Sequence, residues 1–316
     1  MSYADAVNGA LQRLEGVGYE FGPSFVNHAP MAAEALARLG LTDDVPAWVE
    51  QNLRKRRYHD PPEARWPLSG EDKADWSAAL GDFSRVADWT ALFERELAGE
   101  PWRAVLARWW PRLLPGMSAA LTHGVIRTAH AVRGVAVGTG DDRLRLRELA
   151  HGLGYWAARY SGPRRPAAVG SPLVEADAGD EAAALPALDA LIAESAGHYA
   201  RRRQSFPVPL IHSITGPAAV RLVCEHLPPE QKWPSYRVAR ECSEGIRQYF
   251  GREPEVPAEP AAAVTAEELV AAAVELGDEH AIKLAEVAVR QQAVAPDPRY
   301  WAASQVATRQ IARHPF

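Results

Sequence analysis

Residues 265–294 carry apolar side chains at the spacing of an α-helix, and a histidine stands in the middle of their apolar face. At about 100° per residue, five apolar side chains fall within about 40° of this histidine. They surround His280 and are Leu269, Ala273, Leu276, Leu284 and Val287. A buried imidazole without a polar partner is costly, so His280 requires a main-chain carbonyl or a ligand such as a metal ion.

Lys283 follows His280 by one helical turn and lies about 60° away, at the edge of the same apolar stripe. Two interpretations are open for it. Lys283 is a surface lysine paired with Glu279 or Glu286, or its nitrogen shares a site with the imidazole of His280. The other histidines of the chain bear on this choice.

Helical periodicity recurs along the chain, whereas the alternating pattern of strands is nearly absent. We therefore predict an all-α fold, built as a single large multi-helix domain over residues 1–316 with a buried polar pocket. Helices are predicted over residues 4–14, 30–40, 43–57, 86–98, 102–114, 117–135, 143–160, 181–196, 216–227, 235–249, 265–294 and 298–312.

Three stretches lack a helical period. Residues 58–82 carry prolines and tryptophans and are predicted to form an irregular surface excursion, residues 161–180 a mobile loop, and residues 251–263 a connector. The two Gly-x-Gly sequences, at residues 16–18 and 152–154, neither extend to the dinucleotide-binding fingerprint nor follow a strand. The sequence therefore contains no motif for a Rossmann flavin or nicotinamide site.

The charge balance argues against nucleic acid or an anionic membrane as a partner. The formal net charge is −5, and basic residues form no stripe. Charges interrupt the apolar runs well short of a membrane span, and no signal-peptide pattern opens the sequence. Cys224 and Cys242 are too few for a disulfide framework or a cysteine metal site. We expect a cytoplasmic protein that keeps these thiols reduced.

Three further histidines lie in sequence contexts that differ from those of solvent-exposed histidines. His28 precedes a helix with Pro30 in its first turn, where the helix dipole favours a neutral imidazole. His123 shares a helix face with Arg127 and His130, opposite an apolar face. His212 follows a proline-stiffened apolar segment, which suits a rigidly held ligand. The alternatives are that His28 caps its helix and that the face with His123, Arg127 and His130 is exposed to solvent.

Four motifs together resemble those of the questin oxidase-like family. They are FVNHAPM at residues 25–31, THGVIR at 122–127, IHSITG at 211–216 and DEHAIK at 278–283. The similarity extends over nearly the whole chain, with the motifs in the family's order. The resemblance implies an all-helical oxygenase that acts on aromatic polyketides of phenolic or quinone type. It implies Baeyer–Villiger-like or ring-cleaving oxidation with dioxygen (O2) as co-substrate.

The resemblance also implies a mononuclear non-haem iron (Fe) centre with four histidines and an N-carboxylated lysine. Matched residue by residue, these ligands are His28, His123, His212, His280 and Lys283. A carbamate on the lysine nitrogen is an anionic oxygen donor like a carboxylate, and a nearby metal ion stabilises it. Imidazoles suit iron, copper, nickel or zinc, so these ligands alone do not select the metal.

Arg127 and His130 are the candidate catalytic residues, which would hold a phenolate and move its proton. Hydrogen-bonding support of the ligands is their alternative role. Fungal members carry a second histidine and an aromatic residue near these positions, so substrate identity does not transfer. A phenolic substrate could supply electrons itself, and no motif for NADPH is present. The competing functions are a zinc hydrolase and a non-catalytic helical binding protein; catalytic zinc usually has three protein ligands and a water.

Overall fold

Fourteen α-helices, three short 3-10 helices and one β-hairpin form the described part of the chain. The structure is a computed structural model that describes residues 1–138, 142–162, 181–202, 204, 207–255 and 264–313. The α-helices are α1 (Tyr3–Arg13), α2 (Ala29–Arg38), α3 (Val45–Lys55), α4 (Lys73–Ala79), α5 (Val86–Gly99), α6 (Trp102–Leu113), α7 (His123–Ala136), α8 (Arg143–Ala158), α10 (Ala184–Ala200), α11 (Pro207–Cys224), α12 (Pro229–Phe250), α13 (Ala266–Leu276), α14 (Glu279–Val294) and α15 (Pro298–Arg313). The 3-10 helices are η1 (Phe83–Arg85), η2 (Leu114–Gly116) and η3 (Glu181–Ala183).

The hairpin is the only sheet among the described residues. Its strands, β1 (Glu20–Phe21) and β2 (Phe25–Val26), pair antiparallel with Phe21 opposite Phe25. The prediction of an all-α fold built as a single multi-helix domain is therefore confirmed.

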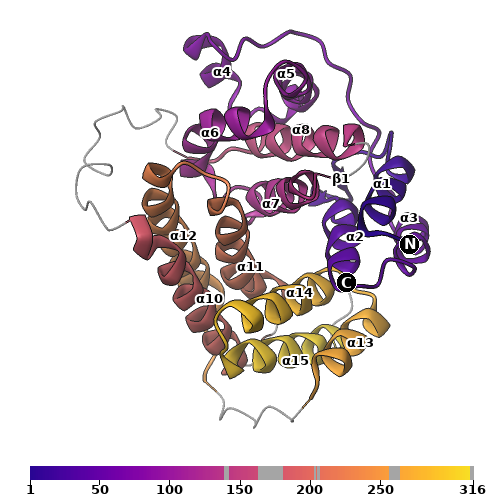
Figure 1. Ribbon diagram of the computed structural model, residues 1–316, viewed down its shortest axis with the longest axis vertical. Helices are drawn as coiled ribbons and strands as arrows, with labels where there is room; N and C mark the ends of the chain where they lie inside the picture. Colours follow the sequence, from indigo (N-terminus) through magenta and orange to yellow (C-terminus); the bar gives the residue numbers. More distant parts are fainter. Residues whose placement is uncertain (139–141, 163–180, 203, 205–206, 256–263, 314–316) are drawn as a thin grey trace.

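Four helices form an inner ring. Figure 1 shows α2, α7, α14 and α11 around the centre of the molecule, and each packs against the next: α2 on α7, α7 on α11, α11 on α14 and α14 on α2. Residues 29–37 of α2 are all buried, as are residues 123–135 of α7. Helices buried on every side face both the interior of the ring and an outer layer.

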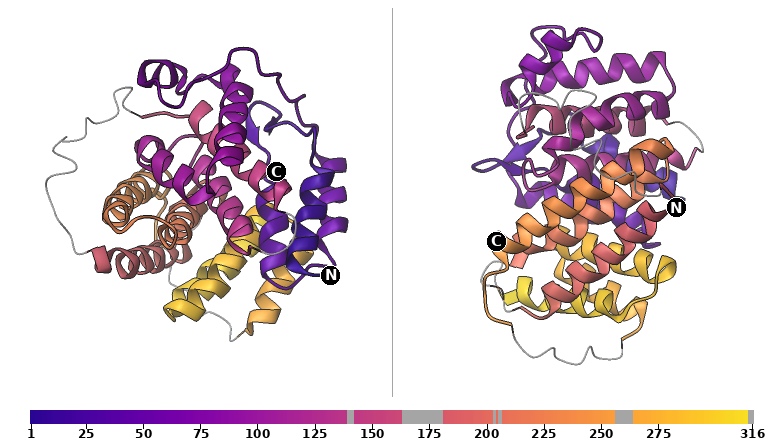
Figure 2. Two further views of the ribbon diagram at one scale, coloured as in Figure 1. Left: turned by 45° about the horizontal axis from the view of Figure 1, so that its top comes forward. Right: turned by 90° about the vertical axis from the view of Figure 1, so that its left-hand side faces the viewer.

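The outer helices cover the ring from outside. Helix α8 packs on α7, with α5 behind it; α1 and α3 pack on α2; α10 and α12 pack on α11; and α13 and α15 pack on α14. Figure 2 shows the purple α5–α6 region and the yellow α14–α15 region at opposite ends of the molecule. Four fully buried tryptophans fill the α5–α6–α8 side; they are Trp89, Trp109, Trp110 and Trp156.

The predicted helix over residues 265–294 is wrong in one respect, because the chain turns at Gly277 into two helices. Gly277 adopts a left-handed conformation, with φ of 71°, and ends α13. The Asp278 carboxylate then accepts hydrogen bonds from the main-chain N–H groups of His280, at 2.8 Å, and Ala281, at 3.2 Å. Asp278 thus caps α14, and the DEHAIK motif opens a helix instead of lying inside one.

The segment that carries His212 is also helical, contrary to the prediction that the helix starts at residue 216. Helix α11 begins at Pro207 and continues through Pro217. A proline inside a helix leaves the carbonyl four residues earlier without its N–H donor. Here that carbonyl belongs to Ser213, and the Ser243 hydroxyl on α12 donates to it at 2.8 Å. A neighbouring helix therefore supplies the missing hydrogen bond.

Other predicted boundaries shift less. Helix α4 interrupts the predicted irregular excursion over residues 58–82, α12 begins at Pro229 instead of residue 235, and α7 begins at His123 instead of residue 117. Most of the predicted mobile loop (161–180) and of the predicted connector (251–263) lies outside the described residues.

Gly124 is the point of closest approach between α7 and α8. A Cβ atom at Gly124 would lie 2.7 Å from Trp156 Cβ and 2.8 Å from its Cα. We expect Gly124→Ala to lower the free energy of unfolding by about 1–3 kcal/mol, because the two helices would have to separate. Urea-induced unfolding measures the change.

The matched control is Gly134→Ala on the same helix, where the nearest atom to an added Cβ is Arg145 Cδ at 3.7 Å. This variant should leave stability unchanged or raise it by up to about 1 kcal/mol through the helix propensity of alanine. Equal effects of the two substitutions would contradict the close packing at Gly124.

Candidate metal centre

The N-terminal parts of the four ring helices bring four histidines together. His28 is the N-cap residue of α2, His123 is the first residue of α7, and His280 is the second residue of α14. His212 lies in the N-terminal half of α11. All four are at most 7 % exposed. Helix N-termini carry partial positive charge, which favours neutral imidazoles at three of these positions.

The imidazole rings are in direct contact. The Nε2 atoms of His28 and His123 are 2.8 Å apart, and the possible ligand atoms of His28, His123 and His280 all lie within 4.8 Å of one another. The ring centroid of His212 is 4.4 Å from that of His123 and 5.6 Å from that of His280. Two nitrogens bonded at about 2.1 Å to one octahedral ion, at right angles, stand about 3 Å apart. The His28–His123 separation fits a shared metal ion.

A strained turn positions His123 and His212. Ala120, Leu121 and Thr122 have φ values of 44°, 53° and 65°, a left-handed region that costs about 1–2 kcal/mol per residue. The turn brings the Ala120 carbonyl to 2.5 Å from His123 Nδ1, and the Thr122 hydroxyl to 3.2 Å from His212 Nδ1. With each Nδ1 engaged, Nε2 is the nitrogen of each ring that a metal ion could use, and that of His123 faces His28 Nε2. Strain of this kind concentrates at functional sites.

Carboxylates lie behind the other two imidazoles. Glu279 Oε1 is 3.6 Å from His28 Nδ1, and Asp278 Oδ1 is 3.6 Å from His280 Nδ1. Arg56 donates to Glu279 at 3.0 Å and fixes that carboxylate. Carboxylates or carbonyls behind a ligand histidine orient the ring and raise its basicity. Each of the four histidines therefore has a polar group near one ring nitrogen.

Lys283 is buried beside the histidines, not paired at the surface. Only 2 % of it is exposed. Burial lowers the pKa of Lys283 to about 8, although the charges of Glu279 and Asp278 oppose the shift. Burial also lowers the pKa of His28 and of His123 well below the usual value, and the positive charge of Lys283 lowers both further. Lys283 is thus a buried lysine one helical turn after His280, and not a surface partner of Glu279 or Glu286.

Unsatisfied nitrogens concentrate in this cluster. Within the part of the chain that the structure describes, Lys283 Nζ, His212 Nε2, His28 Nδ1 and both ring nitrogens of His280 are buried without a hydrogen-bond partner. Each such group costs about 1–3 kcal/mol of desolvation, so a cluster of them calls for a shared partner. His28 Nδ1 and His280 Nδ1 lie near carboxylates, so Lys283 Nζ, His212 Nε2 and His280 Nε2 are the nitrogens of this set that are left for a metal ion.

Arg127 and His130 are held by carboxylates. Arg127 donates to both oxygens of Glu148, at 2.6 and 2.9 Å, and His130 Nδ1 lies 2.6 Å from Glu34 Oε2. Neither Glu148 nor Glu34 is a predicted metal ligand, so these contacts are not hydrogen-bonding support of the ligands. The catalytic role of Arg127 and His130 stays a prediction.

A buried ionic network, which the sequence analysis missed, lies farther along the ring. Arg133 on α7 donates to Glu34 on α2, at 2.5 and 2.8 Å, and also to Glu286 on α14. The Tyr3 hydroxyl donates to Glu34 at 2.5 Å. One signal was available in the sequence, because Glu34 is the lone acidic residue in an otherwise apolar stretch, APMAAEALA. Glu286, which we had considered as a surface partner of Lys283, is only 4 % exposed.

A surface cavity of about 340 Å³ lies between α3 and the start of α14, and none of the five predicted ligands lines it. Asp278 and Glu279 form part of its wall, so the carboxylates that back His280 and His28 separate it from the imidazoles. Trp48, Lys55 and Arg56 supply an aromatic ring and two cations to the same wall. Neither Arg127 nor His130 lines it.

Comparisons with known proteins assign no family to the chain. No protein-family model matches it, and no curated protein matches it. Among the described residues, no helix is both long and apolar enough to span a membrane.

The ionic network gives a prediction about stability. Glu34→Gln should lower the free energy of unfolding by about 3–5 kcal/mol, because it leaves the buried Arg133 without one of its two carboxylates. Glu50→Gln, which breaks the exposed pair of Glu50 with Arg13, is the control and should cost less than about 1 kcal/mol. Equal small losses would contradict a structural role for the network.

The stability difference between the wild type and Glu34→Gln should also depend on pH. Burial alone would raise the pKa of Glu34, but Arg133 and His130 hold it well below its usual range. The contribution of Glu34 is therefore present above the unfolded-state pKa of about 4.3 and is lost as the pH falls toward the folded-state value. The stability difference between wild type and Glu34→Gln should shrink below about pH 4.

Proposed function

We propose that the protein is a metal-dependent oxygenase, with a mononuclear non-haem iron ion held by His28, His123, His212, His280 and Lys283. The observation that carries the proposal is the convergence of four buried imidazoles and one buried lysine from four different helices, with five of their nitrogens unsatisfied among the described residues. An iron ion held there would supply the redox chemistry that activates dioxygen. The resemblance to the questin oxidase-like family supports iron over zinc.

Carboxylation of Lys283 fits its surroundings. Formation of a carbamate requires the neutral amine, and burial favours that form by lowering the pKa of Lys283 to about 8. Neutral imidazoles and a lysine cation would leave a metal cation facing positive charge, whereas a carbamate presents an anionic oxygen. This modification is part of the proposed function.

We place the substrate, a phenolic or quinone aromatic compound, in the cavity beside Asp278 and Glu279. Its volume of about 340 Å³ falls at the lower end of ligand pockets. Trp48 offers an aromatic surface, and Lys55 can neutralise a phenolate. Asp278 and Glu279 stand between this cavity and the imidazoles, where a carboxylate can accept a phenolic proton.

Metal content provides the first test. His280→Ala and Lys283→Ala should each weaken iron binding by at least about tenfold while the circular dichroism spectrum stays helical, because alanine is a good helix former. Lys73→Ala, at an exposed lysine of α4, is the matched control and should retain metal. Added bicarbonate should help reconstitution of the wild type and not of Lys283→Ala.

Full iron occupancy in Lys283→Ala would remove Lys283 from the ligand set. Full occupancy in His280→Ala would refute the site itself, and with it the proposed function.

Catalysis is tested with the iron-loaded protein. It should consume dioxygen in the presence of a polyhydroxylated anthraquinone or its hydroquinone, and nitric oxide should give the EPR signal of a non-haem iron adduct. Protein purified with zinc that hydrolyses an ester without consuming dioxygen would instead indicate the hydrolase. A metal-free native protein would indicate a binding protein.

A further inference from the structure

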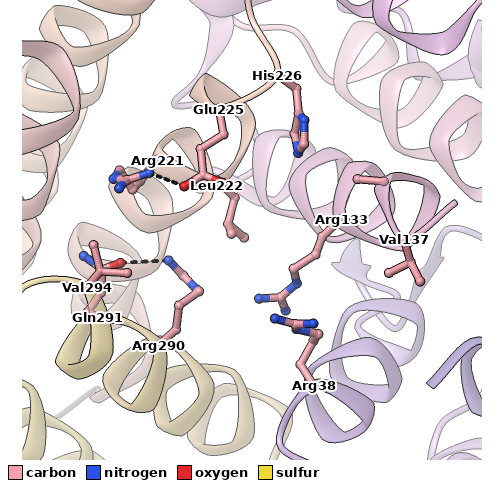
Figure 3. A pocket seen from close by; sticks show the side chains of 11 residues that line it. Arg38, Arg133, Val137, Arg221, Leu222, Glu225, His226, Arg290, Gln291 and Val294 are labelled. Atoms are coloured by element: carbon pink, nitrogen blue, oxygen red, sulfur yellow. Dashed lines mark hydrogen bonds and ion pairs between the residues drawn. The ribbon is translucent and has the colours of Figure 1, made fainter. Parts of the chain in front are cut away.

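A second cavity lies at the other end of the helix ring. Its volume is about 260 Å³, and each ring helix contributes one arginine to its wall. These are Arg38 of α2, Arg133 of α7, Arg221 of α11 and Arg290 of α14. Figure 3 shows the guanidinium groups of Arg38 and Arg133 close to one another, and on the other side Arg221 bonded to Glu225 and Arg290 bonded to Gln291. The cavity opens to solvent between exposed residues such as Arg38 and Val294.

The cavity wall carries an excess of positive charge. Three of the arginines bond to carboxylates that do not line the cavity: Arg133 to Glu34, Arg290 to Glu286 and Arg221 to Asp189. Glu225 is the one carboxylate of the lining, and its side chain is 53 % exposed. Burial lowers the pKa of Arg290 even with Glu286 beside it, and the charges of Arg133 and Arg221 lower it further. Glu286 already lies between two of these arginines, since it bonds to both Arg133 and Arg290. Arg38 is the arginine of the lining that has no carboxylate partner among the described residues.

The carboxylates behind the wall fix three of the guanidiniums in place. Arg221 is bonded to Asp189 at 2.9 Å and to Glu225 at 2.6 Å, and Arg290 to Glu286 at 3.1 Å. Arg38 differs, because among the described residues it forms no ion pair and only stacks over the Tyr3 ring, 5.8 Å from its centroid. A rigid cationic wall with one uncommitted arginine at the opening is preorganised for an incoming anion.

Helix C-termini offer a competing explanation for the arginines. Arg38, Arg133 and Arg221 lie in the last turns of their helices, where partial negative charge favours cations. That effect accounts for arginines near these ends. It does not require four guanidiniums from four helices to face one hollow.

We propose that this cavity binds a phosphate group, as the free ion or as a small phosphate monoester. A carboxylate has two oxygens in one plane and is matched by one bidentate arginine, whereas a phosphate presents oxygens in several directions. Nε, Nη1 and Nη2 of Arg133 are already bonded to Glu34 and Glu286. Arg38 and the remaining N–H groups of Arg221 and Arg290, from three helices, are the donors that suit the second geometry. The apolar part of the wall, Val137, Leu222 and Val294, leaves room for the carbon portion of an ester.

Isothermal titration calorimetry of the purified full chain with inorganic phosphate tests the proposal, at constant ionic strength set with chloride. The wild type should show saturable binding, and Arg38→Gln should weaken it by about tenfold, because one charge-assisted contact is lost. Arg38 is exposed, so the fold should survive. Arg57→Gln, which removes the same charge at an exposed position outside the cavity, is the matched control and should bind phosphate as the wild type does.

Glycerol phosphate in a parallel titration distinguishes the two sources of the group. Tighter binding of the ester indicates a phosphorylated metabolite, and equal or weaker binding indicates the free ion. Absence of saturable phosphate binding up to about 10 mM in the wild type would overturn the proposal. Equal weakening by Arg38→Gln and Arg57→Gln would also overturn it, since diffuse charge would then explain the binding.

Discussion

The guanidinium of Arg133 joins three of the four ring helices, because it lies on α7 and bonds to Glu34 on α2 and to Glu286 on α14. Buried charges are tolerated only when fully paired, so these helices have few alternative axial positions. The same helices carry His28, His123 and His280 at their N-terminal ends. The ionic network therefore fixes the register that brings the imidazoles together. A slip of one residue in any of the three helices would separate both the ion pairs and the histidines.

Polarity along the ring follows the direction of its helices. Imidazoles occupy the N-terminal end, carboxylates the middle and arginines the C-terminal end. Each arginine of α2, α7 and α14 follows the histidine of its helix by ten residues, about 15 Å along a helix axis. The proposed metal centre and the proposed phosphate site are thus opposite ends of one set of helices. Both ends agree with the helix dipole, which disfavours imidazolium at the N-terminus and attracts guanidinium to the C-terminus.

Periodicity predicted nearly every helix, and two of the three misplaced boundaries share a physical cause. Pro217 is predicted to start a helix because a proline inside a helix removes a hydrogen bond. The local sequence does not show that Ser243, on another helix, supplies that bond. Gly277 reads as one residue in a long helix because an apolar period continues on both sides. The turn at residues 120–122 carries no glycine, so its left-handed conformation has no local signature. In the first and third cases, the surrounding structure outweighs local preference.

The sequence by itself determined the helical class, the candidate histidines and the position of Lys283 one turn after His280. These features follow from the spacing of side chains along one segment of the chain. Helical geometry places side chains at that spacing on the same face of the helix. Tertiary structure alone decided that Lys283 is buried, that Glu34, Arg133 and Glu286 pair inside the ring, and that four arginines share a cavity. Each of these depends on contacts between helices far apart in sequence. Burial and ion pairing depend on the distance between helices, which local periodicity does not encode.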